Sequence, residues 1–136
     1  MNYHKIRGVF GDARKLPFQS NTFDIVLLPE VLEHLEYYDA IRALKEALRV
    51  ARGYVILTLP NASKKGYDKN LVENPEHRWL PTHEKIHELV ANAMSMDGKK
   101  LEFVMLETEH RDFIFVLISS SRRNAPLGAR KARAAY

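Results

Sequence analysis

The stretch FDIVLLPEVLEHL, residues 23–35, decides the fold. It begins with an apolar run that stops at Pro29 and continues with Glu30, Glu33 and His34. A short run that is apolar on both faces is typical of a central strand in a parallel sheet covered by helices. We therefore expect a strand over residues 24–28 that delivers carboxylates and a histidine to a functional edge of the sheet.

The rest of the chain alternates between strand and helix patterns. The predicted elements are a strand over 5–10, a helix over 37–51 ended by Gly53, a strand over 54–59, a long irregular loop over 62–81, a helix over 83–96 capped by Thr82, and two strands within 101–108 and 112–120 joined by the turn EHR. This order predicts an α/β fold: a mostly parallel sheet with a terminal antiparallel hairpin, flanked by helices.

Composition and charge limit the class of protein. The 136 residues suit one compact domain, and the zero cysteines exclude disulfides, thiolate zinc sites and cysteine nucleophiles. No apolar run reaches the roughly 20 residues of a membrane span, and residues 1–10 lack the apolar region of a signal peptide. Together with the zero cysteines, this leads us to expect a cytoplasmic protein that does not bind membranes. Five basic residues and no acid lie in residues 122–136, so the rest of the chain carries −1 of the +4 net charge.

We therefore divide the chain into an α/β domain over residues 1–121 and a basic tail over residues 122–136. We expect the tail to be disordered and solvated, while contact with nucleic acid through its basic residues is the alternative.

Three predicted strand ends carry polar side chains. Asp12, the pair Pro29 and Glu30, and the pair Pro60 and Asn61 each follow a predicted strand. Because ligands of open α/β sheets bind at the carboxyl ends of the strands, we expect these residues to line one edge.

Glu30, Glu33 and His34 have the spacing i, i+3 and i+4, which places them on one face of a helical turn. Two carboxylates and an imidazole can bind Mg²⁺, Mn²⁺ or Zn²⁺. His77 or His83 can add a further ligand, and the predicted metal set is Glu30, Glu33, His34 and His83. The alternatives are acids placed at a helix N-terminus by its dipole, and His34 acting as a general base without a metal.

Three ordered segments resemble a known family. GDARKLPFQSNTFDIVLLPEVLEHL, ALKEALRV and GYVILTLPN resemble the second half of class I S-adenosylmethionine-dependent methyltransferases, in the group that includes quinone-biosynthesis enzymes. The resemblance implies that Asp12 and the Ala13 N–H contact the adenine of the cofactor. It also implies that Leu16 and Phe18 form an apolar wall.

In the same family the loop equivalent to Leu28, Pro29 and Glu30 passes the methionine part of the cofactor. Glu30 and His34 are therefore the expected catalytic residues, since a carboxylate suits a cationic sulfonium donor. The Glu-x-x-Glu-His element is also similar to the metal element of some small-RNA 3′-end and quinone O-methyltransferases, where a metal orients the accepting hydroxyl.

One departure from the family is as informative as the match. The glycine-rich loop after the first strand and the acidic residue that holds the ribose have no counterpart, and Gly8 and Gly11 are a very weak substitute. The chain alone should therefore bind S-adenosylmethionine weakly. The strand over 5–10 must pair with residues 24–28, leave the sheet or pair with another chain.

The resemblance thus implies a methyltransferase for an unidentified acceptor that needs a partner or a missing N-terminal half. The alternative is a non-catalytic methyltransferase-like binding or regulatory subunit. We also expect a homo-oligomer or a hetero-partner that covers the open edge of the sheet.

Overall fold

The computed structural model describes residues 6–95, 101–107 and 112–120. Along the chain its elements are β1 (Phe23–Pro29), the 3₁₀ turn η1 (Leu32–His34), α1 (Tyr37–Val50), β2 (Ala51–Pro60), α2 (Lys69–Val72), α3 (His83–Met94), β3 (Leu101–Glu107) and β4 (Phe113–Ser120). The α/β class predicted from the sequence is confirmed, and so are both long helices and the four strands from residue 23 onward.

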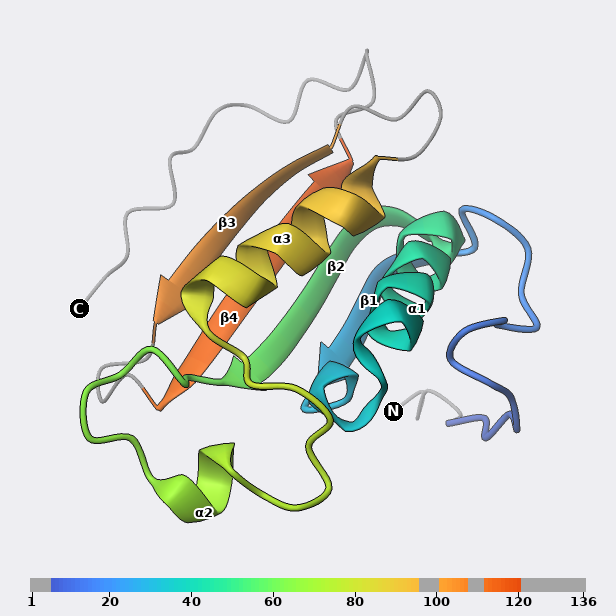
Figure 1. Cartoon of the computed structure of the whole chain (residues 1–136). Coiled ribbons are helices and arrows are strands. Elements are labelled where there is room, and N and C mark those ends of the chain that lie inside the picture. The colour runs from blue at the N-terminus through green and yellow to red at the C-terminus, as the bar shows by residue number, and fades with distance from the viewer. Residues whose placement is uncertain (1–5, 96–100, 108–111, 121–136) are drawn as a thin grey trace, which may run out of the picture.

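The four strands form one mixed sheet in the order β1-β2-β4-β3. β1 and β2 are parallel, with Leu28 opposite Leu57, while β2–β4 and β3–β4 are antiparallel. Figure 1 shows α1 and α3 side by side across one face of this sheet. The parallel pair brings the ends of β1 and β2 to the same edge, next to the segment that contains α2.

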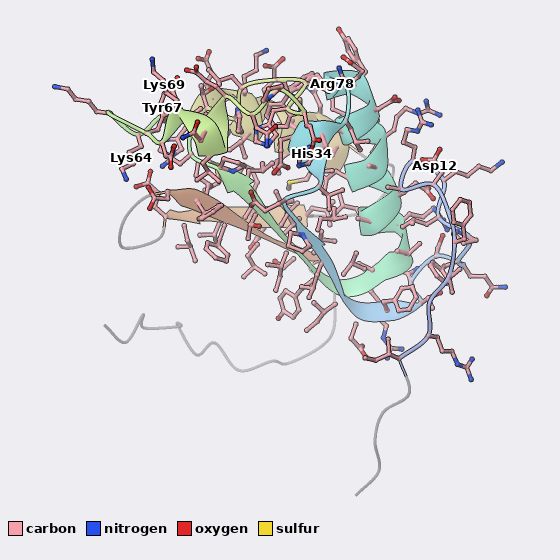
Figure 2. The ribbon with its side chains drawn as sticks, turned by 90° about the horizontal axis from the view of Figure 1, so that it is seen from below. Asp12, His34, Lys64, Tyr67, Lys69 and Arg78 are labelled. Atoms are coloured by element: carbon pink, nitrogen blue, oxygen red, sulfur yellow. The ribbon has the colours of Figure 1, made fainter. Side chains whose placement is uncertain are left out.

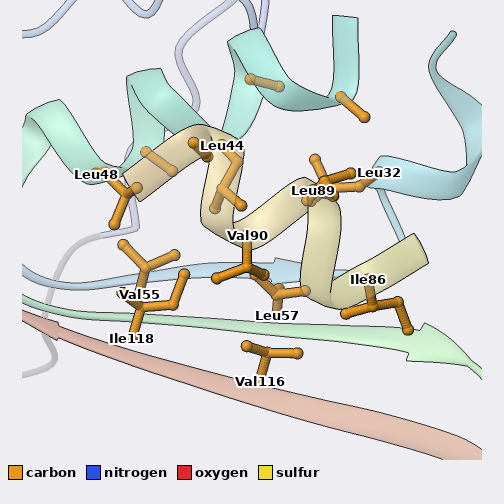
Figure 3. Packing of buried hydrophobic residues seen from close by; sticks show 14 of the residues in the cluster. Leu32, Leu44, Leu48, Val55, Leu57, Ile86, Leu89, Val90, Val116 and Ile118 are labelled. Carbon is orange, nitrogen blue, oxygen red and sulfur yellow. The ribbon is translucent and has the colours of Figure 1, made fainter. Parts of the chain in front are cut away.

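The core lies between these two helices and the sheet. Leu44 and Leu48 of α1 and Leu89 and Val90 of α3 are buried against alternate residues of the strands (Figure 3). The strand residues on this face include Val55, Leu57, Val116 and Ile118. The 3.6-residue period of the helices and the two-residue period of the strands therefore meet at one apolar layer.

The predicted strand over residues 5–10 is wrong for residues 6–10, which have no strand structure. Ile6 and Phe10 of this segment are fully exposed. A strand gains its backbone hydrogen bonds only from a neighbour, and β1 pairs with β2 on one side only among the described residues. The segment has thus left the sheet, which was one of the three expected outcomes.

Residues 11–22 form a loop that is fastened to α1 instead. The Leu16 N–H donates to Glu46 at 2.8 Å, and Arg49 donates to the carbonyls of Phe18 at 2.8 Å and Leu16 at 3.2 Å. Arg49 and Glu46 also pair with each other at 2.7 Å. This half-buried ion pair therefore fixes the loop that leads into β1.

Gly53 does not end the helix, contrary to the prediction. α1 stops at Val50 and β2 starts at Ala51 without an intervening loop. Gly53 lies inside β2, where a side chain would collide with the backbone of β1: a Cβ at this position would lie 2.5 Å from the Asp24 carbonyl oxygen. The glycine is therefore needed for close strand contact rather than for a cap.

Thr82 caps α3 as predicted, because its hydroxyl accepts from the Lys85 N–H at 3.2 Å. In the part of the chain that the structure describes, no helix is long and apolar enough to cross a membrane. The turn EHR and the basic tail over residues 122–136 lie outside the described residues, so the predictions about the tail stay untested.

Candidate functional site

The site begins where β1 ends. After Pro29, Glu30 has a φ of 51°, which is the left-handed region that residues other than glycine rarely occupy. Its N–H donates to the Thr58 carbonyl at 3.1 Å, so the turn is held against β2. One oxygen of the Glu30 carboxyl is buried without a hydrogen-bond partner. Backbone strain of this kind concentrates at functional sites.

Glu33, in the 3₁₀ turn that follows, is fully buried and neither of its carboxyl oxygens has a hydrogen-bond partner. Burial raises the pKa of Glu33 to about 8, and the nearby Glu30 carboxylate adds to this increase. A buried carboxyl without a partner is costly in free energy, and such groups are rare in folded proteins. The position is therefore suited to a proton or to a cation.

His34 and His77 complete a cluster around this carboxyl. Their rings meet edge to face with centroids 4.8 Å apart. One carboxyl oxygen of Glu33 and one nitrogen of each histidine all lie within 4.8 Å of one another. His77 also places its Nδ1 2.9 Å from the Val72 carbonyl oxygen, so Nδ1–H can donate there and leave Nε2 for a ligand.

Two further hydrogen bonds fix the long loop against the 3₁₀ turn. The Arg78 N–H donates to the Glu33 carbonyl at 2.8 Å, and the Trp79 indole N–H donates to the Leu32 carbonyl at 3.0 Å. Figure 2 shows His34 and Arg78 on the same side of the molecule. Because both donors directly follow His77 in the sequence, these bonds hold His77 next to the turn that carries Glu33 and His34.

Trp79 is half-buried against the core and meets the Tyr37 ring edge to face at 5.4 Å between centroids. Trp79 also borders an open hollow of about 360 Å³ that is lined by Glu73, Asn74, His77 and Arg78 as well. The tryptophan is therefore a core anchor at one border of a polar hollow. The hollow shares His77 with the cluster.

The donor set fits a divalent cation. One carboxylate and two imidazoles are ligands that Mn²⁺ and Zn²⁺ accept, and no hydrogen bond in the structure occupies the Glu33 carboxyl oxygens. His83, which was in the predicted metal set, lies elsewhere: its Nε2 is 2.7 Å from the Glu107 carboxylate. The structure thus brings His77 to Glu33 and His34, and not His83.

The predicted adenine contact, Asp12, is not at the end of a strand. Arg14 donates to both of its carboxyl oxygens, at 3.0 Å from Nε to Oδ1 and 2.7 Å from Nη2 to Oδ2. The hydrogen bonds from Arg14 lower the pKa of Asp12 to about 2. Arg14 also pairs with Asp39 at 2.8 Å, and this connection to α1 was missed at the sequence level.

The other predicted cofactor contacts are divided between two places. Ala13 and Leu16 are half-buried in the loop beside α1, whereas Leu28, Pro29 and Glu30 form the exit of β1 next to the cluster. Figure 2 shows Asp12 well apart from His34. The described residues therefore hold a compact acid–histidine cluster and, at a distance from it, a loop whose carboxylate is already engaged.

Comparison with known proteins agrees with this architecture. Residues 2–57 match a family described as a methyltransferase domain. An uncharacterized protein of Methanocaldococcus jannaschii is 37% identical over 57 residues, which are 42% of this chain and 25% of that protein. This chain thus spans a quarter of the curated relative.

Solved structures show the same fold. A SAM-dependent methyltransferase from Thermotoga maritima has a TM-score of 0.55 and 21% identity, over 82% of this chain and 62% of its own. The cyclase SpnF has a TM-score of 0.54 and 16% identity, over 81% of this chain and 53% of its own. The sequence match over residues 2–57 and the shared fold confirm the resemblance to the class I S-adenosylmethionine-dependent methyltransferases, whose fold this chain has over its described part.

Proposed function

We propose that this chain contributes the acceptor side of an S-adenosylmethionine-dependent methyl transfer, with a divalent cation held by Glu33, His34 and His77. The observation that carries the proposal is the buried Glu33 carboxyl, which has no hydrogen-bond partner and lies among two imidazoles. Glu30, strained and partly buried beside Glu33, is the fourth residue of the proposed set. A bound cation supplies Lewis-acid stabilisation of an acceptor oxygen.

The residues of the chain have separate parts in this proposal. Nδ1 of His77 lies 2.9 Å from the Val72 carbonyl oxygen, which leaves Nε2 as the proposed ligand. His34 either ligates the cation or, without a cation, accepts the proton of the acceptor hydroxyl as a general base. The polar hollow beside His77 is the proposed place for the acceptor.

The cofactor part of the proposal rests on Leu28, Pro29 and Glu30 at the exit of β1, and on Asp12, Ala13 and Leu16 in the preceding loop. Carboxylates near the sulfonium would stabilise its positive charge before transfer and orient it. The described residues contain no glycine-rich turn after a strand, so we propose that a partner or a further segment completes the cofactor site.

The cation site is tested by calorimetric titration of the purified chain with Mn²⁺ and with Zn²⁺. We expect one site per chain, and we expect Glu33→Gln and His77→Asn to weaken binding more than about 100-fold, since loss of an outer-shell partner alone costs 10–100-fold. Glu36→Gln is the matched control, because Glu36 is exposed and pairs only loosely with Arg78 at 3.9 Å.

His83→Asn tests whether the ligand is His77, as the structure indicates, or His83, as the sequence predicted. It should leave the affinity unchanged, since His83 pairs with Glu107. Equal affinity in the wild type, Glu33→Gln and His77→Asn would end the proposal of a cation site at this cluster.

Cofactor binding is tested separately, by titration with S-adenosylhomocysteine. For the chain alone we expect a Kd in the millimolar range, since only part of the contacts are present, which corresponds to about −4 kcal/mol. Asp12→Asn should weaken this binding further. No heat for the chain alone or with its natural partner would favour the second candidate function.

That second candidate is a non-catalytic methyltransferase-like binding or regulatory subunit. It is favoured by the engagement of Asp12, whose two carboxyl oxygens already accept from Arg14. The similarity to a cyclase also means that this fold does not by itself imply methyl transfer. Nucleic-acid contact through residues 122–136 and a cytoplasmic location stay predictions.

A further inference from the structure

The face of the sheet opposite α1 and α3 is apolar and uncovered by any described helix or strand. In Figure 2 both long helices lie on one side of the sheet, and side chains project from the other side. We call this surface the bare face. Its apolar side chains, from β1, β2, β4 and β3 in turn, are Ile25, Leu27, Tyr54, Ile56, Phe115, Leu117, Val104 and Leu106.

The exposure of these side chains is large for residues in the middle of strands. Leu27 is 62% exposed, Leu106 is 56% exposed, and Ile25 and Val104 are each 53% exposed. Together, the side chains of the bare face expose several hundred Å², on the order of the roughly 800 Å² that each partner gives to a standard protein interface. Apolar patches of this extent on soluble proteins are often interaction sites.

The charge of the bare face limits what can cover it. Its charged residues, Arg52 and Glu102, stand at the same end of their strands, and Arg52 is already paired with Asp24 at 2.5 Å. Along the rest of the bare face, the described residues are uncharged. A partner with a charged surface would therefore lose solvation without gaining an ion pair.

We propose that the bare face packs against the bare face of a second copy of this chain. A twofold contact presents the same patch from both copies, so the patch must be compatible with itself. A neutral, apolar face meets this condition. Two sheets of identical twist also pack face to face at about 10 Å, with strands within about 30° of each other. The result is a dimer with the clusters of Glu33, His34 and His77 outside the contact, on the edge of each sheet.

The oligomeric state of the full chain tests the proposal. Analytical ultracentrifugation should give a dimer of the 15.7 kDa chain at micromolar concentration. The double variant Leu27→Lys and Leu106→Lys should be a monomer with an unchanged circular dichroism spectrum. Tyr38→Lys is the matched control, because Tyr38 is an exposed aromatic on α1, at 82%, and away from the bare face.

A crosslinking experiment reports the geometry even if the double variant does not fold. The chain has no cysteine, so Phe115→Cys places a single thiol near the middle of the bare face. A short bismaleimide should join two such chains, whereas Tyr38→Cys should stay uncrosslinked. A monomeric wild type, or a dimer that crosslinks only through Tyr38→Cys, would overturn the proposal. A monomer that associates only with a longer polypeptide would show that a different segment covers this face.

Discussion

Raising the pH from 5 to 8 is expected to lower the free energy of unfolding of the cation-free protein. The cause is Glu33, whose pKa is raised to about 8 by burial, above the value of 4.5 for an unperturbed glutamate. In this window the folded state binds a proton that the unfolded state has lost, so stability is complete below pH 4.5 and falls as the pH approaches 8. The limiting slope is about 1.4 kcal/mol per pH unit.

Urea denaturation at several pH values measures this slope. Glu33→Gln, which keeps the shape of the side chain without its titration, should flatten the curve and exceed the wild type in stability at pH 8. Glu36→Gln should keep the slope of the wild type. Carboxyls with a lowered pKa, such as Glu46 beside Arg49, change the stability at lower pH and so do not contribute to the slope between pH 5 and 8. A wild type whose stability rises from pH 5 to 8 would contradict the assignment.

The second large effect is expected at Gly53. Gly53→Ala puts a methyl group 2.5 Å from the Asp24 carbonyl oxygen, which is backbone of the neighbouring strand and cannot rotate away. The parallel pairing of β1 and β2 must then open locally. We expect a loss of about 1–3 kcal/mol, as for other overpacked sites, although alanine ordinarily improves on glycine inside a strand.

Gly8→Ala is the matched control for this substitution. No atom lies within 4 Å of a Cβ added at Gly8, so the free energy of unfolding of this variant should stay within about 0.5 kcal/mol of the wild type. Equal midpoints for Gly53→Ala and Gly8→Ala would mean that β1 and β2 are not held as closely as the structure has them.

The elements with a strong period were predictable from the sequence, and those that depend on a neighbour were not. The stripes of α1 and α3 and the apolar runs of β1 and β2 follow from local pattern, and the structure confirms them. Residues 6–10 have a strand composition but no strand beside them, so their backbone has no partner. Gly53 follows a helical pattern, so the sequence predicted that it ends the helix. Its contact is with Asp24, which lies 29 residues away in the sequence, so no local pattern indicates it.

The candidate site was predictable to the same extent. The spacing of Glu30, Glu33 and His34 predicted three polar groups on one helical turn. In the structure Glu33 and His34 lie in the 3₁₀ turn, whereas Glu30 precedes it with a left-handed backbone. The choice between His77 and His83 depended on the path of an irregular loop of about 20 residues, for which no periodic signal exists. That path is set by hydrogen bonds from Arg78 and Trp79 to the turn. The pairing of Asp12 with Arg14 was open to sequence reasoning, since the charges are two residues apart.

The hydrogen bond from Trp79 to Leu32 has a practical consequence for spectroscopy. Trp79 is the single tryptophan of the chain, and its indole donates to the carbonyl of the residue just before Glu33. Intrinsic fluorescence excited at the indole band therefore comes from one site next to the acid–histidine cluster. Emission from this chain reads out the surroundings of that cluster directly, without a label.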